Sequence, residues 1–401
     1  MQPGTSSFPK PLASAMASTV SSQVSDALFR LALDALSECG DESAVVSPFS
    51  IAMAMGAANL GTRGNSSQEI TDRLFDGISK KEVSEWFREL LEALENYKGL
   101  QFPMKVASAV FLDENLDVLD RYTDDLVEYL KSEVKSVDFL HDSESQVAAL
   151  NEYVEDKTEG KIKDLFNGSS INSSTRIVLV NALHFKAMFE EVFYKEWTQP
   201  EPFYNEDGTI KEVTMMNDCK MGYFAENDDF VYARIPFYHG MIGLPKKDSD
   251  FCFSFIVPKD GKLADLKHKF NPAGHSISSV IADARFSRLI RMALPKFKAE
   301  SSYKLVDTLR NLGISDIFDR ARADFSGITD TSLVVDMIVH KAVIELDEQG
   351  VEGAAATFAA VVDYCLHVPQ EPPKEENIRA DKPFLYTVTY KHIPIFVGQF
   401  Y

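Results

Sequence analysis

The sequence predicts an α+β fold within one intertwined domain. Helix-like periodicity dominates the first third of the 401-residue chain, and strand-like runs dominate the remainder. The two patterns do not alternate as strand–helix–strand units, so a doubly wound parallel sheet is not indicated. No internal repeat or clean linker divides the chain. We therefore expect a single domain over residues 23–401, preceded by an N-terminal extension of residues 1–22.

Composition excludes several classes of protein. The 45% hydrophobic content is ordinary for a globular chain, which argues against extensive disorder. The net charge of −20 disfavours general binding to nucleic acid or to anionic membranes. No apolar run approaches the length of a membrane span. The four cysteines are widely spaced and form no zinc-binding pattern, so we expect neither a metal nor a cofactor: Cys39, Cys219, Cys252 and Cys365.

The N-terminal residues carry no standard signal peptide. Met1 to Ser22 is rich in Ser, Ala and Pro, with one Lys and no apolar run of signal length. Asn65, Asn167 and Asn172 match the pattern of glycosylation acceptors, although such triplets often arise by chance. We expect an extracellular or cell-surface location rather than a cytoplasmic one.

The first helices are read from apolar spacing and from caps. Val24 to Leu36 repeats apolar residues at three and four positions, which predicts an amphipathic helix ending near Gly40. Ser47 is a natural cap, and the proline that follows it fits a first helical turn. The next helix, Phe49 to Leu60, has almost no polar residue, so it should be buried on all sides until Gly61 ends it.

More helices follow before the strand-rich part begins. Gln68 to Phe75, Lys81 to Tyr97 and Arg121 to Ser132 have helical spacing. Lys81 to Tyr97 places glutamates at steps of three and four residues, so its solvent face is acidic. Ser143 to Gln146 is a capping-box pattern, and we expect its helix to close at Gly160.

The strands are predicted from apolar and β-branched runs. Arg176 to Phe185 is nearly continuous in apolar residues, as in a strand covered on both faces. A helix is expected at Ser302 to Leu312. The other expected strands are Val106 to Leu112, Val213 to Met216, Phe230 to Pro236, Phe251 to Pro258, Phe286 to Pro295, Leu333 to Val339, His340 to Leu346 and Phe384 to Tyr390.

One stretch of small residues, Gly350 to Ala360, fits two structures. Its alanines favour a helix by propensity. Its period of two also fits a strand, with Val351, Gly353, Ala355, Thr357 and Ala359 on one face. A strand with uncharged small side chains can enter an existing sheet without a large desolvation cost. A mobile linker is the alternative.

The motifs of common enzymes are missing. The sequence has no GxSxG elbow, no HExxH and no EF-hand loop, and we expect no enzymatic activity. Gly56 to Thr62 resembles the start of a phosphate-binding loop, but Thr62 stands where lysine is required, so a helix end is expected. Four polar residues interrupt apolar segments and can satisfy one another beneath the central strands: Ser47, Ser50, Asn181 and His340.

Ten short motifs carry a family resemblance. They are Ser47-Pro48-Phe49-Ser50-Ile51, Leu150-Asn151-Glu152-Tyr153-Val154, Thr158-Glu159-Gly160-Lys161-Ile162, Leu179-Val180-Asn181-Ala182, Phe185-Lys186, Ala323-Asp324-Phe325-Ser326-Gly327-Ile328, His340-Lys341-Ala342, Asp347-Glu348-Gln349-Gly350, Lys382-Pro383-Phe384 and Phe396-Val397-Gly398. In this order and spacing the chain resembles the serpins, a family of serine protease inhibitors, over Val24 to Tyr401. The resemblance implies three sheets, eight or nine helices and a metastable fold with an exposed reactive-centre loop, here about residues 348–381.

The resemblance also implies a mechanism and roles for named residues. A protease attacks the loop, the acyl-enzyme forms, the loop inserts as a new strand in the central sheet, and the tethered protease is distorted. The shutter beneath that sheet corresponds to Ser47, Ser50, Asn181 and His340. The hinge corresponds to Glu348, Gly350, Val351, Glu352, Gly353, Ala354, Ala355, Ala356 and Thr357. The partner is a serine protease held covalently, and we expect a monomer.

The family's usual spacing places the cleaved bond sixteen residues after the hinge glutamate. Counting from Glu348, 348 + 16 = 364, which is the bond between Tyr364 and Cys365. Tyrosine suits a deep apolar specificity pocket, so a chymotrypsin-like target is expected. Flanking residues that also bear on recognition are Val361, Val362, Asp363 and Leu366. The two valines suit an elastase instead, and the absence of nearby Lys or Arg disfavours trypsin-like enzymes.

Several positions depart from the family's pattern. Val351 stands where Thr or Ser is usual, Gly353 where Ala is usual, and Phe189 where Trp is common. The segment Leu366 to Ala380 is longer than in typical members and serves as a spacer or as an added contact surface. Because Lys81 to Tyr97 is acidic, heparin binding through that helix is not expected. The alternative functions are a non-inhibitory carrier or chaperone, and an inhibitor of papain-like cysteine proteases.

Overall fold

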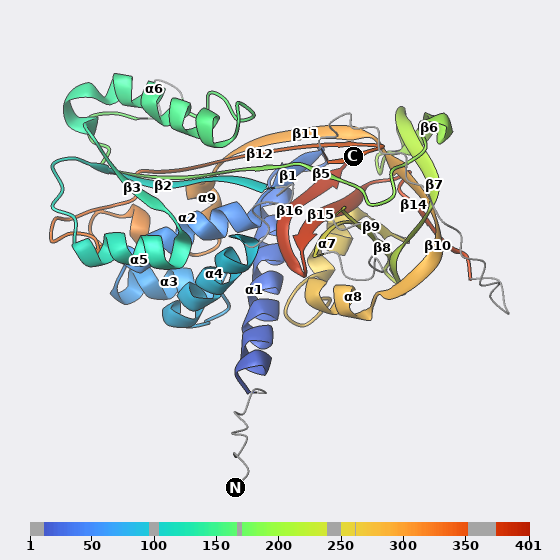
Figure 1. Cartoon of the computed structure of the whole chain (residues 1–401), viewed down its shortest axis with the longest axis horizontal. Coiled ribbons are helices and arrows are strands. Elements are labelled where there is room, and N and C mark those ends of the chain that lie inside the picture. The colour runs from blue at the N-terminus through green and yellow to red at the C-terminus, as the bar shows by residue number, and fades with distance from the viewer. Residues whose placement is uncertain (1–11, 96–103, 167–170, 239–249, 261, 352–373) are drawn as a thin grey trace, which may run out of the picture.

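The structure is a computed structural model that describes residues 12–95, 104–166, 171–238, 250–260, 262–351 and 374–401. These residues form two sheets, with one group of helices below the longer strands and a single helix above them (Figure 1). One large core joins Val24 near the start of the chain to Tyr401 at its end. The described part of the chain therefore folds around a shared core.

Five helices come from the first third of the chain. They are α1 Leu12–Ser37, α2 Pro48–Gly61, α3 Gly64–Leu74, α4 Lys80–Glu95 and α5 Asp120–Leu130. Helix α1 begins at Leu12, before the predicted helix start at Val24, because the Ala- and Ser-rich segment between them lacks glycine and proline and continues the helix. The first turns of α1 project from the body (Figure 1).

Helix α2 lies inside the protein, as its composition predicts. The Ser47 hydroxyl accepts a hydrogen bond from the backbone N–H of Ser50, and Pro48 occupies the first turn. Every residue of α2 is buried. The backbone N–H of Thr62 donates to Ala58 and Asn59 carbonyls, so Gly56 to Thr62 is a helix end, as expected.

The central sheet has seven strands in the order β3-β2-β4-β12-β13-β5, with β11 beside β12. Their bounds are β2 Met104–Asp113, β3 Glu133–Val137, β4 Ile177–Phe185, β5 Ala187–Met188, β11 Phe297–Lys304, β12 Met337–Asp347 and β13 Gly350–Val351. Helix α6, Phe139–Lys157, covers one face, and α2 lies beneath the other (Figure 1). All nine residues of β4 are buried, which confirms a strand covered on both faces.

The second sheet has nine described strands. Its order is β1-β16-β15-β9-β8-β7-β10-β14, with β6 beside β7. The bounds are β1 Ala44–Val46, β6 Thr198–Tyr204, β7 Ile210–Glu226, β8 Phe230–Pro236, β9 Phe251–Pro258, β10 Arg285–Pro295, β14 Glu376–Arg379, β15 Phe384–Tyr390 and β16 Ile393–Phe400. The strand β7 is 17 residues long and pairs with β6, β10 and β8, so hydrogen bonding joins two of the three implied sheets into one.

The short helices lie between these strands. They are α7 Leu263–Lys269, α8 Ile277–Asp283, α9 Leu305–Asn311 and the 3-10 helices η1 Lys195–Trp197 and η2 Asp316–Phe318.

Several predicted boundaries are wrong, among them the strand expected at Val213 to Met216, which extends over the 17 residues of β7. The helix expected from Ser302 begins only at Leu305, because Ser302 to Lys304 continue β11 and pair with β12. The strand expected from Leu333 begins at Met337, where pairing with β4 starts. Helix α6 has an additional first turn, capped by the Asp138 carboxylate, which accepts from the backbone N–H of His141. Asp142 has a φ of −141° and a ψ of 42°, so a kink separates this turn from the helix that begins at the predicted capping box.

Candidate functional site

The first two residues of the small-residue stretch lie inside the central sheet. The strand β13, Gly350–Val351, pairs antiparallel with the end of β12 and also with β5. Val351 faces Leu346 on one side and Ala187 on the other, and it is buried. The expectation that this stretch stands wholly outside its sheet is therefore wrong for Gly350 and Val351. The remaining hinge residues, Glu352 to Thr357, lie outside the described residues.

Only glycine fits the entry point of β13. Gly350 has a φ of +145°, and a Cβ there would lie 2.3 Å from the Ala187 carbonyl oxygen. Two hydrogen bonds hold the chain just before it: the backbone N–H of Phe193 donates to the Glu348 carbonyl, and that of Phe189 to the Gln349 carbonyl, both at 2.7 Å. The hinge is thus bound by its backbone to the segment that follows β5.

A partly buried ion pair fixes the residue before β13. Glu348 is buried, and its Oε2 lies 3.1 Å from the Lys296 ammonium. Burial alone would raise the pKa of Glu348, but a backbone hydrogen bond and the Lys296 ammonium outweigh it and lower the pKa below its ordinary value. Glu348 therefore stays ionised at neutral pH and holds the hinge against the sheet.

The strands β4 and β12 pair with each other over a short distance. Their parallel pairing joins Val178, Leu179 and Val180 to the first three residues of β12. At the other end of the sheet β13 separates β12 from β5, the short strand that follows β4. Because β13 is antiparallel to both neighbours, a chain extended from it between β4 and β12 would pair in the stronger antiparallel manner on each side.

The four polar residues of the predicted shutter lie together beneath this gap. The Ser50 hydroxyl donates to the Asn181 side-chain Oδ1 at 2.7 Å and also lies 2.9 Å from the Asn181 carbonyl. The Asn181 amide donates to Ser108 on the next strand, and the Ser47 hydroxyl donates to the Ile395 carbonyl. These bonds tie α2 to β4, β2 and β16, all inside the core.

His340 completes the cluster from β12. Its Nε2 accepts a hydrogen bond of 2.9 Å from the backbone N–H of Ser47. Among the described residues no group bonds its Nδ1, and the ring stacks beside Tyr303 at 6.0 Å. Full burial lowers the pKa of His340 to about 3, so the ring is neutral and cannot serve as a base of ordinary strength. This agrees with the expectation of a core histidine.

The segment after β5 packs through aromatic rings. Phe189, where the family commonly has Trp, stacks parallel to Phe237 with ring centroids 5.4 Å apart and meets Phe193 and Phe253 at their edges. All four rings are buried. Phenylalanine therefore fills this position by stacking.

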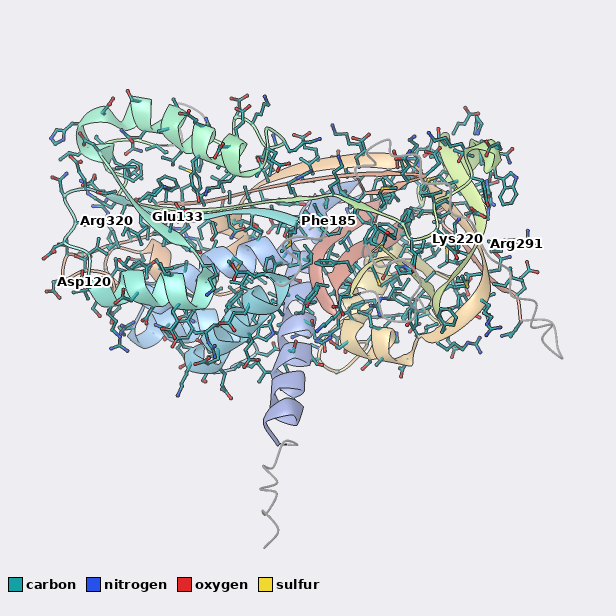
Figure 2. All side chains as sticks on the ribbon, viewed as in Figure 1. Asp120, Glu133, Phe185, Lys220, Arg291 and Arg320 are labelled. Atoms are coloured by element: carbon teal, nitrogen blue, oxygen red, sulfur yellow. The ribbon has the colours of Figure 1, made fainter. Side chains whose placement is uncertain are left out.

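A buried ion pair next to the Phe193 ring was not predicted from the sequence. Lys220 and Asp218 on β7 are 3% and 2% exposed, with 2.5 Å between Nζ and Oδ2. The Lys220 ammonium also donates to the Val192 carbonyl at 2.6 Å and lies 4.9 Å from the centre of the Phe193 ring. Figure 2 shows Lys220 near Arg291, at the end of the molecule formed by β7 and β10. Alternating charges on a strand usually indicate a solvated face, so no local signal marked this pair.

The predicted cleavage site lies outside the described residues. These unplaced residues are Tyr364, Cys365, Val361, Val362, Asp363 and Leu366. The chain is described again from Lys374, and β14 runs parallel to β10. Glu375 pairs with Arg291 at 2.6 Å, and Glu376 is buried and pairs with Arg285. The end of the long Leu366 to Ala380 segment therefore contacts the protein.

The described residues contain neither a membrane-spanning helix nor a cluster of metal-binding side chains. None of the described helices is long and apolar enough to cross a membrane. No group of three or more His, Cys, Asp or Glu side chains in the described ranges could hold a metal ion. Cys39, Cys219 and Cys252 form no disulfide within the described residues, and Cys365 lies outside those ranges.

Comparison with known proteins decides the family. Residues 24–401 match the family model described as Serpin (serine protease inhibitor). This chain is a serpin. It is 33% identical to Serpin A3-1 of Bos taurus over 95% of this chain and 88% of the relative. It is 31% identical to the leukocyte elastase inhibitor of Homo sapiens over 94% of this chain and 99% of the relative.

Solved structures agree on the serpin fold. The native thermophilic serpin tengpin has a TM-score of 0.79 at 22% identity, covering 99% of this chain and 96% of that one. A cleaved Serpin 42Da has a TM-score of 0.77 at 25% identity, covering 94% and 98%. The predicted α+β serpin fold is confirmed.

Proposed function

We propose that this serpin inhibits chymotrypsin-like or elastase-like serine proteases by inserting its cleaved loop into the central sheet. The observation that carries the proposal is the placement of Gly350 and Val351, already paired between β12 and β5. The residues that follow in sequence are mostly small, and apart from Glu352 the first ten carry no charge. Because Glu352 would lie on the other face, a strand begun in this position can lengthen between β4 and β12 without burying a charge on its core face.

The polar cluster below the sheet supports the same proposal. Insertion must separate β4 from β12, and these strands are joined directly by three residue pairs. Ser50 and Asn181 hold α2 to β4, whereas His340 holds β12 to the start of α2. Both strands are thus anchored to the same turn of one buried helix, so parting them by the width of a strand must break or rearrange one of these bonds. Control of this opening is the role proposed for the shutter residues.

The proposed target class rests on the register of the loop. Tyr364 is proposed as the residue before the cleaved bond, and its aromatic side chain fits a deep apolar pocket. The similarity to a relative named leukocyte elastase inhibitor keeps elastase-like enzymes in the proposal. The complex is a covalent acyl-enzyme with one protease per inhibitor.

The experiment is a panel of chymotrypsin, pancreatic elastase, trypsin and papain, each mixed with the full chain. Chymotrypsin or elastase should give a complex that resists SDS, and mass spectrometry of the released C-terminal peptide should place the main cut after Tyr364. A main cut outside residues 361–367 contradicts the register. Complete cleavage without any complex contradicts inhibition, and a complex with papain alone assigns a different class of protease.

A further inference from the structure

A basic hollow on the surface contains none of the hinge residues. The C-terminal end of α2 meets the first turns of α3, α4 and α5 around a cavity of about 640 Å³. Figure 2 shows Asp120, the first residue of α5, at the end of the molecule opposite Lys220 and Arg291. Cavities of this size commonly hold small molecules. Residues that line it include Thr62, Arg63, Ser79, Lys80, Arg121 and Asp125.

Three cations converge on this hollow in a chain of net charge −20. Two carboxylates interact with these cations: Asp324 with Arg63, and Asp125 with Lys80. Arg121 is 85% exposed and has only a long contact of 3.9 Å to Asp125, the one acidic side chain in the lining. The lining side chains therefore carry a net charge of two positive, and Asp324 lies just outside the lining.

Arg63 and Lys80 share the same internal acceptors. The Lys80 ammonium donates to the Leu60 and Thr62 carbonyls at 3.0 and 2.9 Å, and one nitrogen of Arg63 donates to both of these carbonyls. Burial and the neighbouring Arg63 lower the pKa of Lys80 to about 8. Two cations are therefore held side by side, the half-buried Lys80 and the exposed Arg63, and an anion in the hollow would relieve their repulsion.

The first turn of α3 adds further donors. Its cap residue Arg63 makes no side-chain capping bond, and the turn contains no acidic residue. Among the described residues, none accepts a hydrogen bond from the backbone N–H of Gly64, Asn65 or Ser66. By contrast, α4 is capped by Ser79 and Glu82. An uncapped helix start favours negative charge beside it.

We infer that this hollow binds a compact anion bearing phosphate or sulfate groups, through Lys80, Arg63 and Arg121. A small ligand fits better than a long sulfated chain, because the exposed face of α4 beyond the hollow carries Glu82, Glu89 and Glu92. The inference is independent of protease inhibition, since no hinge or shutter residue lines the hollow.

Isothermal titration of the full chain with inorganic pyrophosphate tests this inference, with sodium chloride matched for ionic strength in every cell. We expect saturable binding to the unmodified chain. Lys80→Gln should weaken it about tenfold or more, since a charge-assisted hydrogen bond is lost. Arg121→Gln should weaken it several-fold, and because this side chain is 85% exposed the fold is retained. Lys81→Gln is the matched control: the same charge change on an exposed neighbour outside the lining should leave affinity unchanged.

Two further arms distinguish the sources of the anion. Sulfate tests whether the hollow requires phosphate, and a heparin-derived octasaccharide tests a long polyanion. Tighter binding of pyrophosphate than of the octasaccharide supports the compact site. The inference is overturned if pyrophosphate does not bind, if Lys80→Gln and Arg121→Gln bind as the unmodified chain does, or if Lys81→Gln weakens binding equally.

Discussion

At the scale of the residue, buried polar groups set the chemistry of the proposed site. His340, Asp218 and Lys220 are almost fully buried, and each depends on one or two named partners. Removing a partner leaves a buried polar or charged group without compensation, which costs more than the intact bond contributes. Single substitutions here should therefore have measurable effects on stability.

The His340 ring should make the protein less stable as pH falls. Its pKa is about 3 in the folded chain against an ordinary value of 6.5, so the unfolded state binds more protons between these values. Its contribution is fully present above pH 6.5 and is lost as pH falls toward 3, by at most about 1.4 kcal/mol per pH unit. Denaturant unfolding at pH 7.5 and 5.5 measures the loss.

A matched pair of variants assigns the effect. His340→Gln should flatten the dependence on pH over this range. His268→Gln, which changes an exposed histidine with no ion pair to a described carboxylate, is the control and should leave it as it is. If both variants keep the full dependence, His340 is not its source.

The buried Asp218–Lys220 pair should be costly to break from one side. Lys220→Met leaves a buried carboxylate without its cation and should lower the free energy of unfolding by about 3–5 kcal/mol. Asp218→Asn combined with Lys220→Met should recover most of that loss, because no lone charge remains. Chemical denaturation measures both variants, and Arg291→Met, on a 60% exposed side chain, is the surface control. Equal stability of the single and double variants would contradict the coupling.

At the scale of the element, the important feature is the two-residue strand β13. It is short, yet it pairs with strands on both sides, and Gly350 fits where a Cβ would overlap the Ala187 carbonyl. Local sequence allowed a strand from Gly350, and Gly350 and Val351 form one, whereas the rest of the stretch lies outside the described residues. It could not indicate that these first residue pairs with β12 and β5 are already formed, because that depends on β12 and β5 lying one strand apart.

A charge at Val351 should prevent insertion. The side chain is 1% exposed between Leu346 and Ala187, so Val351→Arg would bury an unpaired cation, at a cost of several kcal/mol. We expect this variant to be cleaved by the target protease as a substrate, with little SDS-resistant complex. Val351→Thr, which keeps the size and the branching, should inhibit normally. Unchanged stoichiometry of inhibition in the arginine variant would show that the hinge does not need to enter the sheet.

At the scale of the whole molecule, the central sheet is held between α6 on one face and α2 on the other (Figure 1). Beneath α6 the sheet presents small side chains, among them Ala107, Ala109 and Ala182. On the opposite face α2 is anchored to both β4 and β12. The proposed insertion adds one strand to this sheet, so its energetic effect should appear in global unfolding.

Cleavage within the loop should therefore stabilise the chain. New antiparallel pairing on both sides of the inserted strand should raise the thermal midpoint by at least about 10 °C. Differential scanning calorimetry before and after cleavage near residue 364 measures the shift. Cleaved Val351→Arg should show little of it, and an unshifted midpoint in the cleaved unmodified chain would favour a non-inhibitory role.

The sequence by itself determined the locally encoded features. The cap and the apolar length of α2, the full extent of β8, β9 and β15, and the family's motifs are properties of neighbouring residues, and all were predicted. Only the tertiary structure decided which distant segments meet: β13 between β12 and β5, Lys220 under the Val192 carbonyl, and Arg63 beside Lys80. The physical reason is that strand register and the pairing of buried charges depend on contacts between residues far apart in the chain, and local periodicity carries no information about those contacts.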